Sequence, residues 1–294
     1  MRYLIGYDIG TSSIKAALLD IATGAVLAAV QSPDTEMEIL APQPGFAEQH
    51  PERWWQEVVH ATGRLKGKVS FKPEEIAGIG ISYQMHGLVC VDADGQVLRP
   101  SIIWCDSRAV NIGKKAFNDL GEGYCLTHLL NSPGNLTASK LRWVKENEPD
   151  LFSRIKYFML PGDFIAMKLG ARPNVESNWA LESGLYDRAN QPQPDVVAAI
   201  NLDTTLLAEV LNPGTIVGEV DAEGQAFSGL NIGTPIVVGG ADHVLSAYGA
   251  GLTVEGDWLI KLGGAGDILA VSTTEVLDPR LYLDLHPVDG LYLP

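Results

Sequence analysis

Apolar runs separated by turn residues dominate the first part of the chain, and this pattern predicts β-strands. Residues 4–9 and 14–20 form two such runs, joined by a small, hydroxyl-rich turn, and a third run follows at residues 24–32. Later, a buried strand leads into a loop at residues 83–87, after which the chain continues as another strand. The pattern therefore predicts a β-sheet that begins with three consecutive strands.

Helical spacing of apolar residues appears after these strands. Within residues 50–65, Trp54 and Trp55 begin a helical repeat of apolar residues, and we expect both tryptophans to anchor the core. A later helix is broken by Pro149, and another helix begins at Pro161 after a short strand. The alternation of strands and helices predicts an α/β chain with a mixed sheet packed against helices.

A polar, proline-bearing region runs from Gln191 to about Gly218, and we expect one domain to end there. The predicted domains are residues 1–218 and 219–294. In the second, residues 256–274 consist of two apolar strands around a small-residue turn, which repeats the design of the opening hairpin. Two such hairpins, one near the start of each domain, predict two domains of the same topology that face each other across a cleft.

Composition and charge exclude several classes of protein. The chain has 294 residues, 46% of them hydrophobic, and a formal net charge of −15. That charge argues against a nucleic-acid or anionic-membrane partner, because both need a basic face. The sequence contains no uncharged run of apolar residues long enough to span a membrane. Three scattered cysteines do not form a disulfide framework, so we expect reduced thiols and a cytoplasmic location.

The opening hairpin places a single carboxylate, Asp8, just before the turn Gly10–Ser13. A tight turn of small residues can hold a phosphate on its backbone N–H groups. A carboxylate can join such a phosphate only through a divalent cation such as Mg²⁺. The pattern also fits an ordinary hairpin with Asp8 at a strand end. No Walker-type phosphate loop or dinucleotide fingerprint occurs elsewhere in the sequence, so any ATP site depends on this hairpin and its repeat.

Asp242 is a second carboxylate with a marked position, because it follows an apolar strand and a Gly-Gly-Ala turn where a helix begins. Glycines at such a point let a ligand approach the backbone closely. The alternative is a helix N-cap, in which the aspartate only accepts a hydrogen bond from the first turn. His243 beside it is either a titrating partner or a polar cover for the helix start.

The loop after the buried strand carries Gln84, Met85 and His86. An amide and an imidazole can bond to hydroxyl groups, and a thioether can contact C–H faces. This combination suits a polyol, although the same residues could serve packing alone.

The order of these segments resembles the FGGY family of carbohydrate kinases, within the actin/Hsp70/sugar-kinase superfamily. The segments that carry the resemblance are "YDIGTSSIKAALLD", "PGFAEQHPERWW", "GISYQMHGLV", "IIWCDSRA", "TASKLRWVKENEP", "LPGDFIAMKL" and "VVGGADHVLSAYGAG". The "QMHG" segment is similar to that of the xylulokinases within the family. The resemblance implies an actin-like (ribonuclease H-like) ATPase fold with two similar domains, the second incomplete in these residues.

The resemblance also implies a function: ATP-dependent phosphorylation of a pentulose, first of all D-xylulose, in xylose metabolism. Mg²⁺ would be held by Asp8, directly or through water. Asp242 would be the general base that takes the proton from the terminal hydroxyl of the sugar. The other sugar-binding residues would be Gln84, Met85, His86 and His243. The residues along the ATP phosphates would be Gly10, Thr11, Ser12, Ser13, Lys15, Gly263 and Gly264.

The sequence departs from the family pattern at two of these places. His243 stands where the family usually has asparagine, and the second phosphate turn, Gly263–Gly266, lacks the usual hydroxyl side chains. Family members are also longer, so we expect these residues to be part of a longer kinase. Two alternatives stay open: a kinase for another ketose or polyol, such as ribulose or erythritol, and a non-catalytic sugar-binding protein. A homodimer also stays open.

Overall fold

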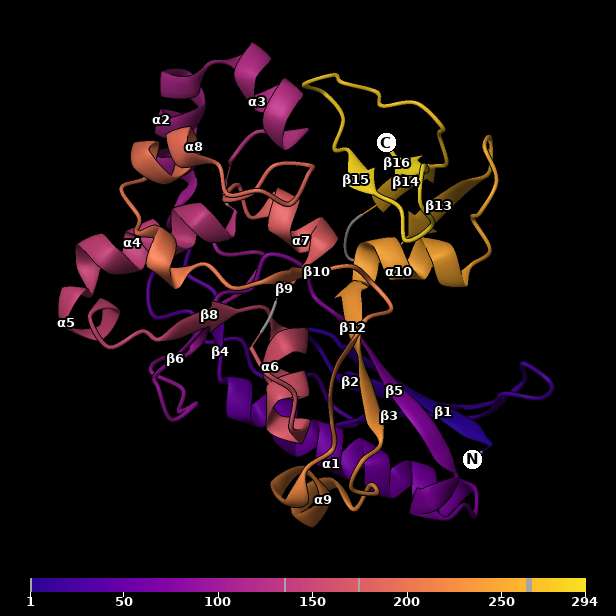
Figure 1. Ribbon diagram of the computed structural model, residues 1–294. Helices are drawn as coiled ribbons and strands as arrows, with labels where there is room; N and C mark the ends of the chain where they lie inside the picture. Colours follow the sequence, from indigo (N-terminus) through magenta and orange to yellow (C-terminus); the bar gives the residue numbers. More distant parts are fainter. Residues whose placement is uncertain (1, 135, 174, 263–265) are drawn as a thin grey trace.

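The computed structural model describes residues 2–134, 136–173, 175–262 and 266–294. A six-stranded mixed sheet, in the order β11-β12-β5-β1-β2-β3, lies at its centre (Figure 1). Its strands are β1 (Tyr3–Ile9), β2 (Ile14–Asp20), β3 (Val26–Ser32), β5 (Ile76–Tyr83), β11 (Ile216–Glu219) and β12 (Pro235–Ala241). The first three strands pair antiparallel, whereas β5 pairs parallel with both β1 and β12. The predicted mixed sheet and its three opening strands are confirmed.

Alternating burial fixes one face of this sheet against a long helix. In β1 the buried positions are every second residue, Tyr3, Ile5, Tyr7 and Ile9. The helix α1 (Pro51–Lys68) packs against β2 and β3 (Figure 1). Its buried side chains include both tryptophans, as predicted. Burying an aliphatic or aromatic side chain of this size contributes about 1.5–3 kcal/mol, so this contact is a major source of stability.

A mostly helical part of the chain follows between β5 and β11, and it occupies the left and centre of Figure 1. Its helices are α2 (Val110–Leu120), α3 (Glu122–Leu129), α4 (Thr137–Asn147), α5 (Pro149–Phe152), α6 (Pro161–Leu169), α7 (Ser177–Glu182) and α8 (Pro194–Ala199). Its short strands are β6 (Val89–Val91), β7 (Ser101–Ile102), β8 (Tyr157–Met159), β9 (Val175–Glu176) and β10 (Val210–Leu211). The strand β4 (Glu48–Gln49) comes earlier in the chain, just before α1, and pairs with β7. The predicted helix break at Pro149 and helix start at Pro161 are both observed. Two 3-10 turns lie at Pro73–Glu75 and Thr204–Leu206.

The sheet does not divide at the boundary expected near residue 218. Gly218 lies within β11, which pairs with β12, and β12 pairs with β5 in the first sheet. The polar region before it is therefore a connection within one unit, because the chain returns from the mostly helical part to the same sheet. The short helix α9 (Ala222–Ser228) lies between these two strands in the chain, and α10 (Asp242–Gly249) follows β12 directly. We propose that the second unit begins after α10.

The last part of the chain lies beyond α10, in the upper right of Figure 1. It contains two antiparallel pairs, β13 (Trp258–Leu262) with β14 (Gly266–Ala270) and β15 (Asp284–Leu285) with β16 (Tyr292–Leu293). The predicted second hairpin is thus confirmed. Within the ranges that the structure describes, no helix is both long and apolar enough to cross a membrane.

Candidate functional site

Three of the segments singled out from the sequence meet at one edge of the central sheet. Parallel pairing places Asp8 of β1 opposite Ser82 of β5, and Gly240 of β12 opposite the same serine. Asp8, the loop after β5 and Asp242 after β12 therefore gather at the carboxyl ends of three neighbouring strands. Ligands of open α/β sheets bind at this kind of edge.

Asp8 has one paired and one unpaired carboxylate oxygen. Its Oδ2 lies 3.0 Å from Nζ of Lys15, directly across the β1–β2 pair. Its Oδ1 is buried and has no hydrogen-bond partner among the residues that the structure describes. A buried carboxylate oxygen without a partner is unfavourable unless a ligand binds it. An oxygen of this kind fits a hard cation such as Mg²⁺.

The rest of the surroundings agrees with a magnesium ion rather than a metal held entirely by protein. Across the described ranges, no group of three or more His, Cys, Asp or Glu side chains could hold a metal ion. Mg²⁺ is typically bound by one or two carboxylates together with water and substrate phosphates. Asp8 fits as a protein carboxylate of such a site.

The turn after Asp8 is held tightly in place. A Cβ atom at Gly10 would lie 2.9 Å from the backbone oxygen of Ser13, so the turn needs glycine there. The hydroxyl of Thr11 donates to Oε1 of Gln84 and accepts from Nε1 of Trp104, both at 3.0 Å. The backbone oxygen of Thr11 accepts from Nε2 of Gln49 at 2.8 Å. Thr11 thus fixes the position of the turn within the fold.

Ser12 and Ser13 complete the predicted phosphate turn. The backbone oxygen of Ser12 accepts from the N–H of Met37 at 2.8 Å, and Ser13 is buried. The second predicted turn cannot be compared with the first, because Gly263 and Gly264 lie outside the described residues.

Asp242 is the first residue of α10, and the N-cap position is occupied by Ala241, which makes no side-chain cap. The carboxylate of Asp242 still accepts a backbone hydrogen bond from His243 in the first helical turn, as the capping alternative expects. Burial raises the pKa of Asp242 above its ordinary value, and the charge of Asp8 raises it further, against the opposing effects of Lys261 and His243. A half-buried carboxylate with a raised pKa beside a second carboxylate is typical of an acid–base pair.

The glycines before Asp242 have a role that differs from the one expected. They lie inside β12 instead of forming a turn. A Cβ atom at Gly239 would lie 1.3 Å from the backbone oxygen of Ile81, so glycine is required for β12 to approach β5. The close approach at Gly239 is therefore between two strands.

The loop after β5 uses its three candidate side chains differently. Gln84 is almost completely buried; besides Thr11 it contacts Gln49, 3.4 Å away, so it supports the turn rather than facing open space. Met85 is half-buried and packs against a small apolar cluster that includes Ala241 and Val244. Met85 therefore links the loop to the start of α10.

His86 occupies the left-handed region of backbone conformation, with φ 55°. Its Nε2 lies 3.3 Å from the hydroxyl of Tyr282, and its backbone oxygen accepts from Nζ of Lys140 at 2.6 Å. Burial, together with the charges of Lys140 and His243, lowers the pKa of His86 to about 3. The ring is therefore neutral near pH 7 and can both donate and accept a hydrogen bond, as sugar hydroxyls require.

His243 lies between two carboxylates of the last part of the chain. Its Nδ1 is 3.9 Å from Asp267 of β14, and its Nε2 is 3.6 Å from Asp284 of β15. Neither aspartate was singled out from the sequence, because nothing in their local pattern links them to residue 243. The tertiary fold alone brings them to the site.

Three more residues at this edge of the sheet were not singled out from the sequence. Trp104 is half exposed and bonds Thr11, Gln49 supports the turn, and Lys140 bonds the loop at His86. Trp104 and Lys140 stand in segments that carried the family resemblance, which was the available signal. Gln49 also stands in such a segment, although the partner that shows its role, Thr11, lies 38 positions away.

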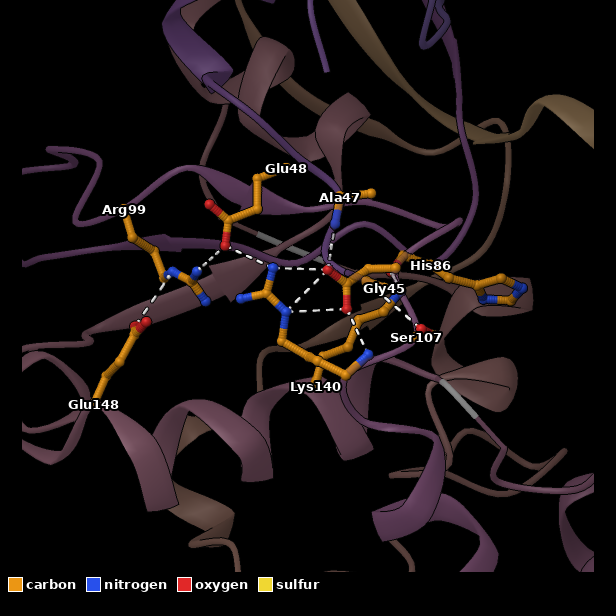
Figure 2. A network of polar contacts seen from close by, with 10 residues as sticks. Gly45, Ala47, Glu48, His86, Arg99, Ser107, Lys140 and Glu148 are labelled. Atoms are coloured by element: carbon orange, nitrogen blue, oxygen red, sulfur yellow. Dashed lines mark hydrogen bonds and ion pairs between the residues drawn. The ribbon is translucent and has the colours of Figure 1, made fainter. Parts of the chain in front are cut away.

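A buried network of charges supports these residues (Figure 2). Arg108 lies 2.7 Å from Glu48 and from Asp106, and Arg99 lies 2.5 Å from Glu48 and 3.3 Å from Glu148. The network ties the segment before α1 to the segment that carries Trp104. Paired buried charges of this kind fix one arrangement of the chain, because breaking any pair leaves an uncompensated charge.

Comparison with known proteins identifies what this chain is similar to. The sequence model of the FGGY family of carbohydrate kinases, N-terminal domain, matches residues 3–249. This match extends past residue 218 to the end of α10, in agreement with the continuous sheet.

Xylulose kinases are prominent among the similar proteins. The xylulose kinase of Bacillus subtilis (strain 168) is 32% identical over 276 residues, covering 92% of this chain and 54% of that protein. The xylulose kinase of Lactococcus lactis subsp. lactis (strain IL1403) is 32% identical over 298 residues, covering 99% of this chain and 58% of that protein. The chain thus spans a little over half the length of these curated relatives.

The solved structures agree on the fold. The xylulose kinase from Rhodospirillum rubrum superposes with a TM-score of 0.90 at 36% identity, over 100% of this chain and 60% of that one. A glycerol kinase from Plasmodium falciparum, solved with ADP, reaches a TM-score of 0.86 at 17% identity over 100% of this chain and 60% of that chain. The expected actin-like fold, with mixed sheets and flanking helices, is confirmed.

Proposed function

The chain belongs to the FGGY family of carbohydrate kinases, and from this premise we propose that it phosphorylates a pentulose with ATP. D-xylulose is the first candidate, with D-xylulose 5-phosphate as product, because xylulose kinases are similar to this chain over nearly its whole length. The single observation that carries the proposal is the meeting of Asp8 and Asp242 at one sheet edge, close enough for the charge of one to raise the pKa of the other.

The two carboxylates divide the work. Asp242 accepts the proton of the sugar hydroxyl while the hydroxyl oxygen bonds to the γ-phosphorus of ATP and the bond to ADP breaks. A positioned base of this kind typically contributes about 10²–10⁴-fold to the rate. Oδ1 of Asp8 would hold Mg²⁺, which supplies positive charge against the phosphate oxygens when bound.

The other residues bind and orient. Backbone N–H groups of the turn Gly10–Ser13, with the ammonium of Lys15, line the phosphates. The neutral imidazole of His86 donates to or accepts from a sugar hydroxyl, and Met85 contacts the C–H faces of the sugar. His243 binds the sugar on the side of Asp242.

A second candidate function is phosphorylation of another ketose or polyol, such as ribulose or erythritol. The observation that favours it is His243 with Asp267 and Asp284 on either side, since this group of polar side chains changes which hydroxyls the site can bond. The cytoplasmic location, the lack of a nucleic-acid partner and a homodimeric assembly stay predictions from the sequence and the family.

The test is ADP release from ATP by the complete gene product over a panel of D-xylulose, D-ribulose, erythritol and glycerol. We expect the highest kcat/KM with D-xylulose, and a preference for another member of the panel would select the second candidate. Saturable sugar binding without ADP release would instead identify a non-catalytic sugar-binding protein. The absence of both binding and turnover for every member of the panel would contradict the proposed function.

A further inference from the structure

Lys140 of α4 is completely buried, and no carboxylate of the described residues forms an ion pair with it, which is rare for a buried lysine. Its ammonium makes one hydrogen bond within the described ranges, from Nζ to the backbone oxygen of His86 at 2.6 Å. Helix α4 and the loop after β5 are 54 positions apart in the chain at this contact. This buried cation therefore binds one backbone carbonyl group of the loop that carries Gln84, Met85 and His86, which we call the sugar-site loop.

That carbonyl belongs to a residue whose backbone needs support. His86 is not a glycine, yet its φ of 55° lies in the left-handed region, which L-residues with a side chain adopt only at a free-energy cost. A charged hydrogen bond to its carbonyl stabilises the peptide orientation that goes with this conformation. The same orientation brings Nε2 of the imidazole to the hydroxyl of Tyr282.

The charges around Lys140 explain why it can stay buried. Asp106 attracts the ammonium, whereas Arg108 repels it. The oxygens of Asp106 already bond Arg108 and the N–H of Ala47, so Asp106 acts on Lys140 through its field rather than through a bond. Figure 2 shows Lys140 and His86 beside this network, with the His86 ring pointing away from it.

We propose that Lys140 is a positioning residue of the sugar site, whose ammonium holds the His86 carbonyl and thereby aims the imidazole at the sugar. The proposal rests on the proposed function for the identity of the ligand. It adds a residue that does not touch the substrate and acts through the backbone of one that does.

The test compares Lys140→Met with Lys145→Met in the complete gene product. Lys145 also lies on α4 and donates to a backbone oxygen, that of Asn201, at 2.5 Å, but outside the site. We expect Lys140→Met to raise the KM for the sugar about tenfold or more, since hydrogen bonds from charged donors are among the stronger ones. The KM for ATP should not change, and Lys145→Met should leave both constants as they are.

A crystal structure of Lys140→Met makes the test independent of the substrate. We expect residue 86 to leave the left-handed region, or its ring to lose the contact with Tyr282. A ring and backbone unchanged from the parent would overturn the proposal, as would an unchanged sugar KM in an active variant. If the parent itself binds no sugar, the proposed function fails, and the crystal structure still decides whether Lys140 positions His86.

The pH dependence supplies a readout that does not need the variant to fold. Burial lowers the pKa of Lys140 to about 7, with Asp106 acting in the opposite direction. The ammonium is therefore lost as the pH rises through about 7, and a neutral amine is a weaker donor. Sugar affinity of the parent protein should fall over this range, and an affinity that stays constant between pH 6 and 9 would contradict the role of the charged form.

Discussion

The ammonium of Lys15 lies 3.0 Å from Oδ2 of Asp8 and leaves Oδ1 of the same carboxylate buried without a partner in the described part of the chain. The two residues face each other across the β1–β2 pair, so the hairpin itself sets the geometry. One oxygen is neutralised from within the protein, and the other is available to a cation. This relationship favours a metal site over the ordinary hairpin, the alternative that the sequence left open.

Asp8→Asn should reduce turnover strongly and raise the Mg²⁺ concentration needed for half-maximal rate, because an amide oxygen is a weaker ligand for a hard cation. Sugar binding measured by calorimetry should stay nearly unchanged. Asp34→Asn is the matched control, since Asp34 is an exposed carboxylate paired with Arg64. Near-normal turnover of Asp8→Asn at limiting Mg²⁺ would make Asp8 a structural residue.

Asp242→Asn should keep its melting temperature and its sugar affinity while kcat falls at least about a hundredfold, because the change removes the proton acceptor and preserves shape. The side chain does not occupy the N-cap position, so the change should not unfold α10. The measurement is steady-state ADP release together with thermal unfolding. A stable variant with a tenth or more of the parent rate would refute the general base.

When kcat/KM is plotted against pH, the acidic limb of the curve should report the raised pKa of Asp242. A base works only when ionised, so activity is lost as the pH falls through this pKa, at a higher pH than an ordinary aspartate with a pKa of 3.8 would give. Since the charge of Asp8 contributes to the shift, Asp8→Asn should move the limb to lower pH. A limb that does not move would show that the two carboxylates act independently.

Gly10→Ala should distort the first phosphate turn, because the new Cβ would lie 2.9 Å from a backbone oxygen that cannot move aside. We expect a loss of about 1–3 kcal/mol in the free energy of unfolding and a larger rise in the KM for ATP than for the sugar. Gly6→Ala in the preceding strand β1 is the control, since a Cβ there would meet no atom within 4 Å. Equal effects of the two substitutions would rule out a special role for the turn.

His86→Ala should raise the sugar KM and leave the ATP KM nearly unchanged. Loss of one hydrogen bond to a neutral hydroxyl corresponds to about 0.5–1.5 kcal/mol, and more if a buried partner is left unpaired. Tyr282→Phe removes the hydroxyl that lies 3.3 Å from the imidazole and should have a smaller effect in the same direction. Sugar KM values equal to that of the parent would assign His86 to packing.

Local pattern was sufficient for the features that depend on neighbouring residues. Alternating burial in β1 and β2, the helix that begins at Pro51, the break at Pro149 and the hairpin of β13 and β14 follow from periodicity and turn chemistry within short windows. The order of the motifs also identified the family, because Asp8, the loop at residues 84–86 and Asp242 each stand in a recognisable segment.

Only the tertiary structure decided the features that depend on distant partners. The strand β12 looks like the start of a new domain in the sequence, yet Gly239 lets it pack against β5 across more than a hundred intervening positions. Asp284 approaches His243, and Lys140 bonds His86, for reasons that no local window contains. Periodicity records which face of an element is buried, whereas the packing of the whole chain decides which elements become partners. In this protein, that packing brings Lys140 to the loop at residues 84–86 and so holds the loop in place.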